Sequence, residues 1–288
     1  MSNKVTLESI KKLRELTGVG FNDCKTALDE ANGDIEKSIE FLRKKGIAKA
    51  SKKMSRTASE GLVLVNEEKG QISVIEVNSE TDFVAKNKDF ISFCKEISKL
   101  NFSVKGDLEK LNQLKMNNKI TVKENLVNLI AKIGEKIIVR RANFFDNDKG
   151  VNFYYVHSAI EKNIGKIVSV VKLQGIIEGK NDDIGSKISM HVAATNPLAI
   201  NEDGIKKEVI DKELEIIKAE IKNSGKPDNI VDKISKGKIT KFINDNTLQN
   251  QIWIMDPKKK VSDILKENKV DEELKILDFI RFKVGEGV

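Results

Sequence analysis

The chain has 288 residues, of which 39% are hydrophobic and 33% charged, and its formal net charge is +7. No apolar run approaches the ~18 residues that a membrane-spanning helix needs, and the first residues enter a helical pattern without an apolar signal core, so we expect a cytoplasmic protein that binds no membrane. With only two histidines, two cysteines that lack metal-ligand spacing (Cys24 and Cys94) and no phosphate-loop, dinucleotide, serine-hydrolase or HExxH motif, we expect no enzyme, no metal site and no cofactor.

The positive charge is concentrated near the N-terminus. Residues 1–58 hold 13 Lys or Arg against 8 Asp or Glu, and many of the basic residues lie between Arg43 and Arg56. Such a stretch can contact nucleic-acid phosphates or an acidic protein surface, and it is also typical of a solvated helix face. Composition alone leaves these alternatives open.

Three short helices are predicted in residues 6–45, separated by the turns "TGVG" (17–20) and "NGD" (32–34). Gly46 is expected to end the third helix. The expected N-terminal caps are polar side chains that can accept a hydrogen bond from a free backbone N–H: Thr6, Asn22 or Asp23, and Asp34. The predicted apolar stripe of the first helix consists of Ile10, Leu13 and Leu16.

The hydrophobic period then changes to that of strands. The segments "GLVLV" (61–65) and "QISVIEV" (71–77) flank the turn "NEEKG" and predict a β-hairpin. A helix is expected to carry an apolar stripe from Phe90 to Leu100, more helix is expected in 105–133, and a strand is expected within 132–145.

The same pattern recurs further along the chain. Residues 68–77 align with residues 163–172 at an offset of 95, and the match continues into the helix that follows each segment. The matched pairs are Gly70 with Gly165, Ile72 with Ile167, Ile75 with Val170, Phe93 with Ile188 and Ile97 with Val192. The recurrence predicts two related α+β subdomains that arose as an internal repeat.

Two charged helices with apolar stripes, residues 205–222 and 229–243, are joined by the turn "NSGKPDN" and predict an antiparallel helical hairpin. A helix near 261–268 and a strand within 276–288 complete the chain. We therefore expect an α+β fold with four parts. They are an N-terminal three-helix domain (1–55), a core N-subdomain (56–150), a core C-subdomain (151–204 and 244–288) and the inserted hairpin (205–243).

The segment "EVNSETDFVAKN" (76–87) carries a phenylalanine, Phe83, at the tip of a polar turn between strand and helix. The corresponding part of the second copy, "QGIIEGKND", has no matching Asp-Phe pair, so the architecture does not require this residue. Phe83 therefore either packs back on its own helix or is presented to a partner, for which an exposed aromatic side chain is a suitable anchor.

Several long segments in fixed order resemble the elongation factor Ts family, the exchange factors of elongation factor Tu in bacterial and organellar translation. They are "LRELTGVGFNDCKTALDEANGDIEKSIEFLRKKG", "EVNSETDFVAKN", "AKIGEKIIVRR", "HVAATNP", "SGKP" and "FIRFKVGEG". The resemblance covers essentially the whole chain. It implies that residues 1–55 form a UBA-like domain, and that the protein binds elongation factor Tu in its GDP and nucleotide-free forms, displaces Mg²⁺ and promotes GDP release without covalent chemistry.

Individual roles follow from the same resemblance. It implies that Mg²⁺ is dislocated from the partner by the turn Thr81, Asp82, Phe83 and Val84. Other contacts with the partner are implied for Arg14, Phe21, Asn22, Ile133, Gly134 and His157, although relatives often carry methionine at positions 21 and 22. His191, on an apolar helix, is interpreted as a core residue.

The hairpin corresponds in the family to a region that serves contacts between copies of the factor, which implies self-association through residues 205–243. Many members continue past the final "GEG" into a further helix that reaches the partner; this chain stops at Val288, so we expect that contact to be absent or supplied differently. The alternative function is that of a basic nucleic-acid-binding protein. Because aromatic residues are few and lie mostly on stripes of buried type, we expect no direct nucleic-acid partner.

Overall fold

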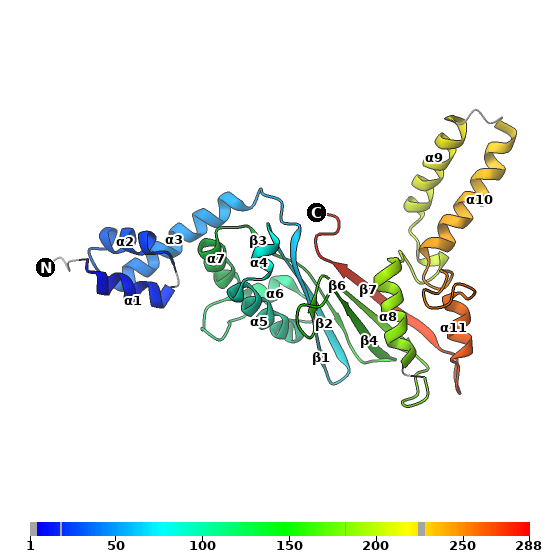
Figure 1. The fold of residues 1–288 in the computed structure, drawn as a ribbon, viewed down its shortest axis with the longest axis horizontal. Coiled ribbons are helices and arrows are strands. Elements are labelled where there is room, and N and C mark those ends of the chain that lie inside the picture. The colour runs from blue at the N-terminus through cyan, green and yellow to red at the C-terminus, as the bar shows by residue number, and fades with distance from the viewer. Residues whose placement is uncertain (1–4, 18, 182, 224–227) are drawn as a thin grey trace.

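The structure, a computed structural model, describes residues 5–17, 19–181, 183–223 and 228–288. The helices are α1 (Leu7–Thr17), α2 (Phe21–Glu30), α3 (Ile35–Lys53), α4 (Asp82–Ala85), α5 (Lys88–Val104), α6 (Leu108–Gln113), α7 (Val122–Ile133), α8 (Asp183–Thr195), the 3-10 turn η1 (Glu202–Gly204), α9 (Lys207–Asn223), α10 (Asp228–Asn246) and α11 (Val261–Glu267). The strands are β1 (Glu60–Glu68), β2 (Gln71–Ser79), β3 (Ile137–Phe145), β4 (Val151–His157), β5 (Ile164–Gly165), β6 (Ile167–Gln174) and β7 (Lys275–Lys283). This mixture of helices and antiparallel sheets confirms the predicted α+β class (Figure 1).

Helices α1, α2 and the first half of α3 form an N-terminal helical layer with a core of its own. Its buried residues are Ile10, Leu13, Cys24, Ala27, Leu28 and Leu42. Thr6 and Asp34 cap α1 and α3 as predicted, since their side chains accept hydrogen bonds from the backbone N–H groups of Ser9 and Lys37. The predicted cap of α2 is wrong, because the helix already begins at Phe21 and Gly20 occupies the cap position.

Leu16 also departs from expectation, since 61% of its surface is exposed although it was assigned to the buried stripe of α1. The predicted helix break at 17–20 includes residue 18, which lies outside the described residues.

Helix α3 continues past Gly46, where the sequence predicted its end, and runs to Lys53. The reason is tertiary packing. Gly46 is buried against α7, and a β-carbon there would lie 3.4 Å from the β-carbon of Ala131. Ala50, one turn further on, belongs to the core beneath α7. Gly46 therefore lets two helices approach each other, and α3 joins the N-terminal layer to the core as one continuous helix (Figure 1).

The larger sheet has the strand order β3-β2-β1-β5, and its paired strands are antiparallel. Helices α5, α6 and α7 cover one face through a core that includes Leu62, Ile75, Phe90, Ile97 and Ile130. The predicted β1–β2 hairpin is confirmed, and its strands are longer than predicted and buried on both faces over most of their length.

The smaller sheet has the order β4-β6-β7, and α8 and α11 pack on one of its faces. Its other face meets the larger sheet in a third cluster that contains Val63, Val74, Val168, Val170 and Phe282. The core is therefore a sandwich of two sheets with helices on both outer sides (Figure 1). Strand β4 was not predicted from the sequence.

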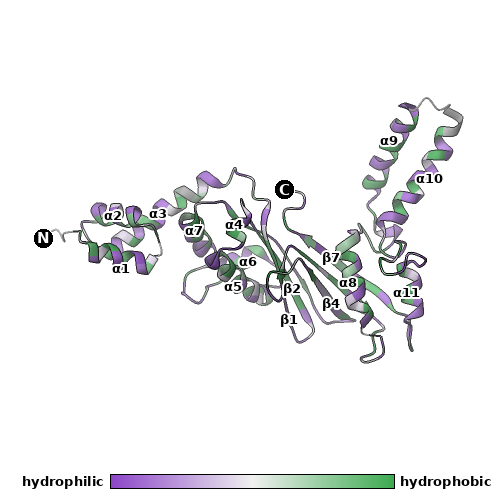
Figure 2. Ribbon diagram, viewed as in Figure 1, coloured by the Kyte–Doolittle hydropathy of each residue, from purple (hydrophilic) through white to green (hydrophobic). Residues whose placement is uncertain are grey.

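Helices α9 and α10 pack on each other and project from the sandwich as the predicted antiparallel hairpin (Figure 1). Their shared core is small and consists of Ile217, Ile221 and Val231, with Ile234 and Ile239 against it. Hydrophobic and hydrophilic residues alternate along both helices (Figure 2). Residues 224–227 of the predicted connecting turn lie outside the described residues.

Within the part of the chain that the structure describes, no helix is both long enough and apolar enough to cross a lipid bilayer. The same residues contain no group of three or more His, Cys, Asp or Glu placed to hold a metal ion. Cys24 and Cys94 are buried free thiols, and His191 is fully buried in the core, as predicted.

Candidate partner-binding surface

The turn that leads from β2 to α5 carries the exposed aromatic residue predicted from the sequence. At its tip, 77% of the surface of Phe83 is accessible to solvent. The next two residues, Val84 and Ala85, are buried in the core beneath α5 and are 6% and 2% exposed. Phe83 is therefore presented to solvent and does not pack back on its own helix, whereas Val84 anchors the turn.

Thr81 occupies the N-cap of the short helix α4. Its backbone N–H and its hydroxyl both donate to the carboxylate of Glu135, at 3.0 and 2.8 Å. The hydroxyl of Ser79 in turn donates to the Thr81 carbonyl at 3.0 Å. These bonds fix the base of the turn from two sides.

Asp82 begins α4 and pairs with Lys86, which donates to its carboxylate at 2.8 Å. This hydrogen bond is the largest effect on the pKa of Asp82 and, with the positive charges of Lys86 and Lys166, holds that pKa below its usual value. Asp82 therefore stays ionised beside Phe83, so the tip combines an apolar side chain with a negative charge.

The loop after α7 lies against the base of this turn. Gly134 ends α7 with φ +87°, a conformation that glycine adopts without strain, and it is exposed, whereas Ile133 is half-buried. Glu135 reaches Thr81 from this loop, and the Gly134 carbonyl accepts a hydrogen bond from Lys53 at the end of α3. The structure thus brings Ile133 and Gly134 together with the turn that carries Phe83.

His157 lies at the exposed end of β4, where its Nδ1 and the Tyr155 hydroxyl are 3.2 Å apart. The His157 carbonyl accepts a hydrogen bond from the backbone N–H of Lys166, and Lys166 forms an ion pair with Glu60 at 2.8 Å. Glu60 is the strand partner of Ser79, at the end of β2 from which the turn leads, so this ion pair links the end of β4 to the base of the turn.

Arg14, Phe21 and Asn22 lie elsewhere, on α1 and α2 of the N-terminal layer, and the structure does not bring them to the turn (Figure 1). All three are exposed, and 40% of the surface of Phe21 is accessible. The exposed Leu16 lies two residues beyond Arg14 and adds apolar surface that the sequence analysis assigned to the core. The predicted site therefore consists of two separate surfaces joined by α3.

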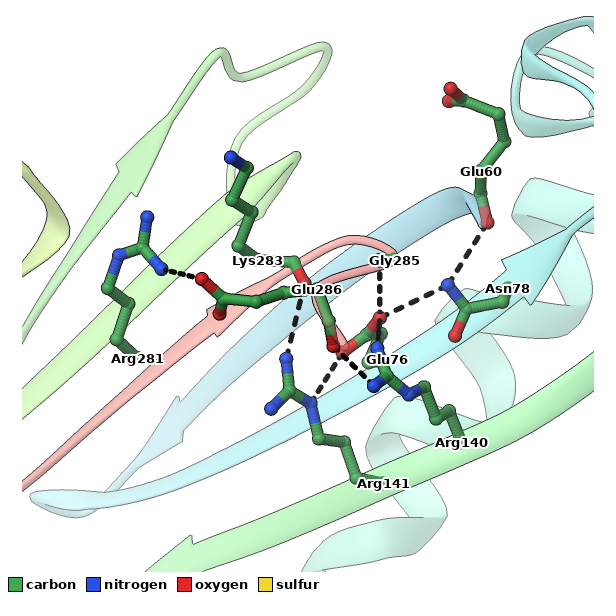
Figure 3. A network of polar contacts seen from close by, with 9 residues as sticks. All are labelled: Glu60, Glu76, Asn78, Arg140, Arg141, Arg281, Lys283, Gly285 and Glu286. Carbon is green, nitrogen blue, oxygen red and sulfur yellow. Dashed lines mark hydrogen bonds and ion pairs between the residues drawn. The ribbon is translucent and has the colours of Figure 1, made fainter. Parts of the chain in front are cut away.

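A buried carboxylate lies on β2, the strand that leads to the turn. Glu76 of β2 is fully buried and accepts hydrogen bonds from four groups (Figure 3). The donors are Arg140 Nη1 (3.1 Å), Arg141 Nε (2.5 Å), Asn78 Nδ2 (3.1 Å) and the Gly285 N–H (2.9 Å).

A β-bulge explains why two consecutive arginines reach one carboxylate. Consecutive side chains of a regular strand point to opposite faces of the sheet. Here Glu76 is paired with Arg141 and Val77 with Val139, so Arg140 is an extra residue in β3. The bulge changes the local direction of the strand and lets both guanidinium groups approach Glu76.

The same network holds the C-terminal segment. The Gly285 N–H binds Glu76, and the Glu286 carbonyl accepts a hydrogen bond from Arg140 (Figure 3). Gly285 has φ +72°, and a β-carbon there would lie only 2.0 Å from the carbonyl oxygen of Ser59, so no other residue fits. The end of the chain is thereby fastened across the start of β1.

Three exposed or hydrogen-bonded residues of the two surfaces were not singled out from the sequence. Glu135 lies in the quoted segment "AKIGEKIIVRR" but was not singled out. Ile160, in the loop next to His157, is 45% exposed. It is an apolar residue in a polar stretch, which is the signal that identified Phe83. Leu16 gave no such signal, because its spacing fits a buried stripe.

Comparison with known proteins gives consistent results. A family model described as Elongation factor TS matches residues 80–286, a region that starts at the turn and ends in the C-terminal segment. The proteins named Elongation factor Ts from Methylorubrum extorquens and Xanthobacter autotrophicus are each 43% identical to this chain over 289 residues, covering 99% of it and 94% and 93% of their own lengths. The protein of the same name from Clostridium kluyveri is 41% identical over 292 residues, with 99% of this chain and 94% of that protein covered.

Proposed function

The chain belongs to the elongation factor Ts family, a family of translation elongation factors, and from this membership we propose that it is the guanine-nucleotide exchange factor of elongation factor Tu. It binds Tu·GDP, displaces the bound Mg²⁺ and promotes GDP release. The observation that carries the proposal is Phe83, an aromatic side chain 77% exposed on a turn whose base is fixed by hydrogen bonds and by buried Val84.

The proposed mechanism is differential binding. The protein binds nucleotide-free Tu more tightly than Tu·GDP, so by linkage its binding weakens GDP by the same factor. Phe83 enters a pocket of the partner beside the nucleotide site. Thr81 and Asp82 contact the partner next to Phe83, and Val84 anchors the turn. Loss of Mg²⁺ removes charge compensation from the phosphates, and GDP leaves faster. No covalent chemistry is involved.

Further contacts are proposed on both surfaces. Ile133, Gly134 and His157 border the turn and face the same partner domain or its neighbour. On the N-terminal layer, Arg14, Phe21 and Asn22 supply affinity at a distance from the nucleotide.

Two architectural proposals accompany the function. The N-terminal layer is a UBA-like domain, and the two sheets with their helices are copies of one repeat. The helix pairs Phe93 with Ile188 and Ile97 with Val192 support the repeat, because all four are buried on the helix that covers their own sheet. The strand pair Ile75 with Val170 does not fit the predicted alignment, because Ile75 belongs to the helix-covered core and Val170 to the core between the sheets. The hairpin α9–α10, whose small core leaves Val209 and Ile216 exposed, serves self-association.

The alternative, binding to nucleic acid through the basic N-terminal stretch, has less support. Four of its basic residues are paired with carboxylates of the same chain: Arg43 with Glu124, Lys44 with Glu40, Lys45 with Asp23 and Arg56 with Glu80. A charged face engaged in this way offers fewer free cations to phosphates.

The proposal is tested by mixing the protein with elongation factor Tu loaded with fluorescent GDP and measuring nucleotide release. The wild-type protein accelerates release, and Phe83→Ala slows it by roughly 30-fold, which corresponds to about 2 kcal/mol for a buried aromatic anchor. Ile216→Ala, an exposed apolar residue of the hairpin, serves as the control and leaves release unchanged. If Phe83→Ala is as active as wild type with an intact circular dichroism spectrum, the anchor role is wrong.

A further inference from the structure

Two loops of the candidate surface exchange carboxylate hydrogen bonds with each other. Glu80, from the β2 end, accepts a hydrogen bond from the backbone N–H of Lys136 at 2.5 Å. Glu135, from the loop after α7, accepts from the N–H and the hydroxyl of Thr81 at 3.0 and 2.8 Å. Each loop thus supplies a carboxylate to the backbone of the other, and we call this arrangement the reciprocal clasp.

The Glu80 half of the clasp is tied to the end of α3. Arg56 donates to both oxygens of Glu80, at 3.2 and 3.3 Å, and the Arg56 carbonyl accepts a hydrogen bond from Lys136 Nζ at 2.7 Å. Desolvation would raise the pKa of Glu80, but the hydrogen bonds from Lys136 and Arg56, with the charges of Arg56 and Lys53, hold it below its usual value. Glu80 is therefore ionised, and it is held by hydrogen bonds from both Arg56 and Lys136.

The Glu135 half acts on the residue that starts α4. An N-cap threonine normally accepts a hydrogen bond from the first turn of its own helix, which fixes that turn. The Thr81 side chain makes no such bond and donates to Glu135 instead. Because α4 has only four residues, it has little stability of its own, and its orientation depends on its two ends.

Phe83 depends on that orientation more than any other residue of the turn. With 77% of its surface exposed, its side chain has few contacts within the protein that could fix its direction. Its position is set by the backbone of α4, which Glu135 holds at one end and buried Val84 holds at the other.

We propose that Glu135 is a positioning residue for nucleotide exchange: it holds the backbone of Thr81 so that Phe83 is oriented for the partner before the two proteins meet. This inference rests on the proposed function. A residue that is already held in its bound conformation loses less conformational freedom on binding. Without Glu135 the turn would be more mobile, and the contact of Phe83 with the partner would be weaker although no contact atom is lost. Glu135 itself need not touch the partner.

The test is a double-mutant cycle in the nucleotide-release assay with elongation factor Tu loaded with fluorescent GDP. Glu135→Ala slows the maximal rate of release about fivefold, the change that corresponds to the net contribution of one hydrogen bond. Glu135→Gln, whose amide oxygen can still accept one of the two bonds from Thr81, shows a smaller loss. In the Phe83→Ala background, Glu135→Ala changes the rate less than twofold, because the side chain it orients is gone.

A matched control is Asp107→Ala. Asp107 is also a carboxylate that accepts backbone hydrogen bonds at the start of a short helix, α6, and it belongs to none of the predicted contacts. Its removal leaves the rate unchanged. Circular dichroism and the thermal midpoint establish that each variant is folded, and the Gln variant provides the test if the Ala variant is not.

The outcomes separate this inference from the proposed function. Equal losses from Glu135→Ala in the wild-type and Phe83→Ala backgrounds would show that Glu135 does not act through Phe83 and overturn the inference alone. The same holds if folded Glu135→Ala and Glu135→Gln are as active as wild type while Phe83→Ala is impaired. If Phe83→Ala itself has no effect, the anchor role and the positioning role both fail.

Discussion

Replacing Glu76 by glutamine tests how much one buried carboxylate contributes to stability by linking β2 to β3 and to the C-terminal segment. The amide keeps the size of the side chain but loses the negative charge that faces Arg140 and Arg141. Its NH₂ group is a hydrogen-bond donor and replaces an oxygen that accepts hydrogen bonds from neighbouring donors. The backbone N–H of Gly285, at 2.9 Å from Glu76, shares the same carboxylate oxygen with Arg140 and Asn78. The substitution therefore affects β2, β3 and the C-terminal segment together.

The structure sets the size of the effect. Removal of one partner from a buried ion pair costs about 3–5 kcal/mol, because the other charge stays buried without compensation. Here the side chains of Arg140 and Arg141 are 22% and 31% exposed, so water can reach part of each guanidinium. We therefore expect the lower end, about 3 kcal/mol, which at about 2 °C per kcal/mol lowers the melting temperature of a protein of this size by about 6 °C.

Scanning calorimetry measures this shift, with Glu267→Gln as the control. Glu267 forms an ion pair with Lys259 in which both side chains are well exposed, and loss of such a pair has little effect on stability because water screens both charges. Amide hydrogen exchange provides a local measurement, since the Gly285 N–H should exchange faster in Glu76→Gln. A melting temperature within 1 °C of wild type together with unchanged exchange at Gly285 would refute the role assigned to the network.

Three further predictions concern other parts of the molecule. Residues 205–243 can be replaced by a short Gly/Ser linker, which must span only the roughly 10 Å between packed helices. The shortened protein should still promote GDP release from elongation factor Tu and should no longer self-associate in sedimentation. Loss of exchange in a folded product would place the hairpin in the exchange interface. A chain that begins at Gly46, which keeps the half of α3 that packs on α7, should still promote GDP release at high concentration, with a higher half-saturating concentration. A folded but inert product at every concentration would contradict the proposed division of labour. Burial lowers the pKa of His191, which stacks on Trp253, so the unfolded chain binds more protons and stability should fall as pH drops below the unfolded pKa of about 6.5. Urea unfolding between pH 7.5 and 5.5 measures this slope, which should be weaker in His191→Gln.

The sequence predicted the elements whose signals are local. Caps at Thr6 and Asp34, the apolar strands of the β1–β2 hairpin and the stripe of α5 are each contained in a short segment, and each prediction is confirmed. Strand β4 was missed because "VNFYYVH" does not alternate clearly, and the structure leaves all of its residues partly or fully exposed.

Features that depend on distant residues could not be predicted. A glycine at position 46 indicates a helix end in isolation, and only the approach of α7 shows that it permits a close contact. Glu76 and Arg140 are separated by 64 residues, and the bulge that aligns them has no sequence signature.

The candidate site shows the same division. Phe83 was identified because a large apolar residue in a polar turn is unusual. Glu135 was not, because it is one of 44 acidic residues and only its hydrogen bonds to Thr81 distinguish it.

If the partner binds both proposed surfaces, the continuity of α3 makes the protein a rigid bivalent ligand. Its 19 residues, at 1.5 Å per residue, form a rod about 28 Å long that packs on α1 and α2 at one end and on α7 at the other. A partner that binds both the N-terminal layer and the turn carrying Phe83 meets the second surface at an effective concentration fixed by this rod, so the avidity of the pair exceeds the affinity of either contact. Insertion of one residue into α3 would keep both surfaces intact but rotate one against the other by about 100°. The partner would then lose simultaneous engagement and the avidity that comes with it.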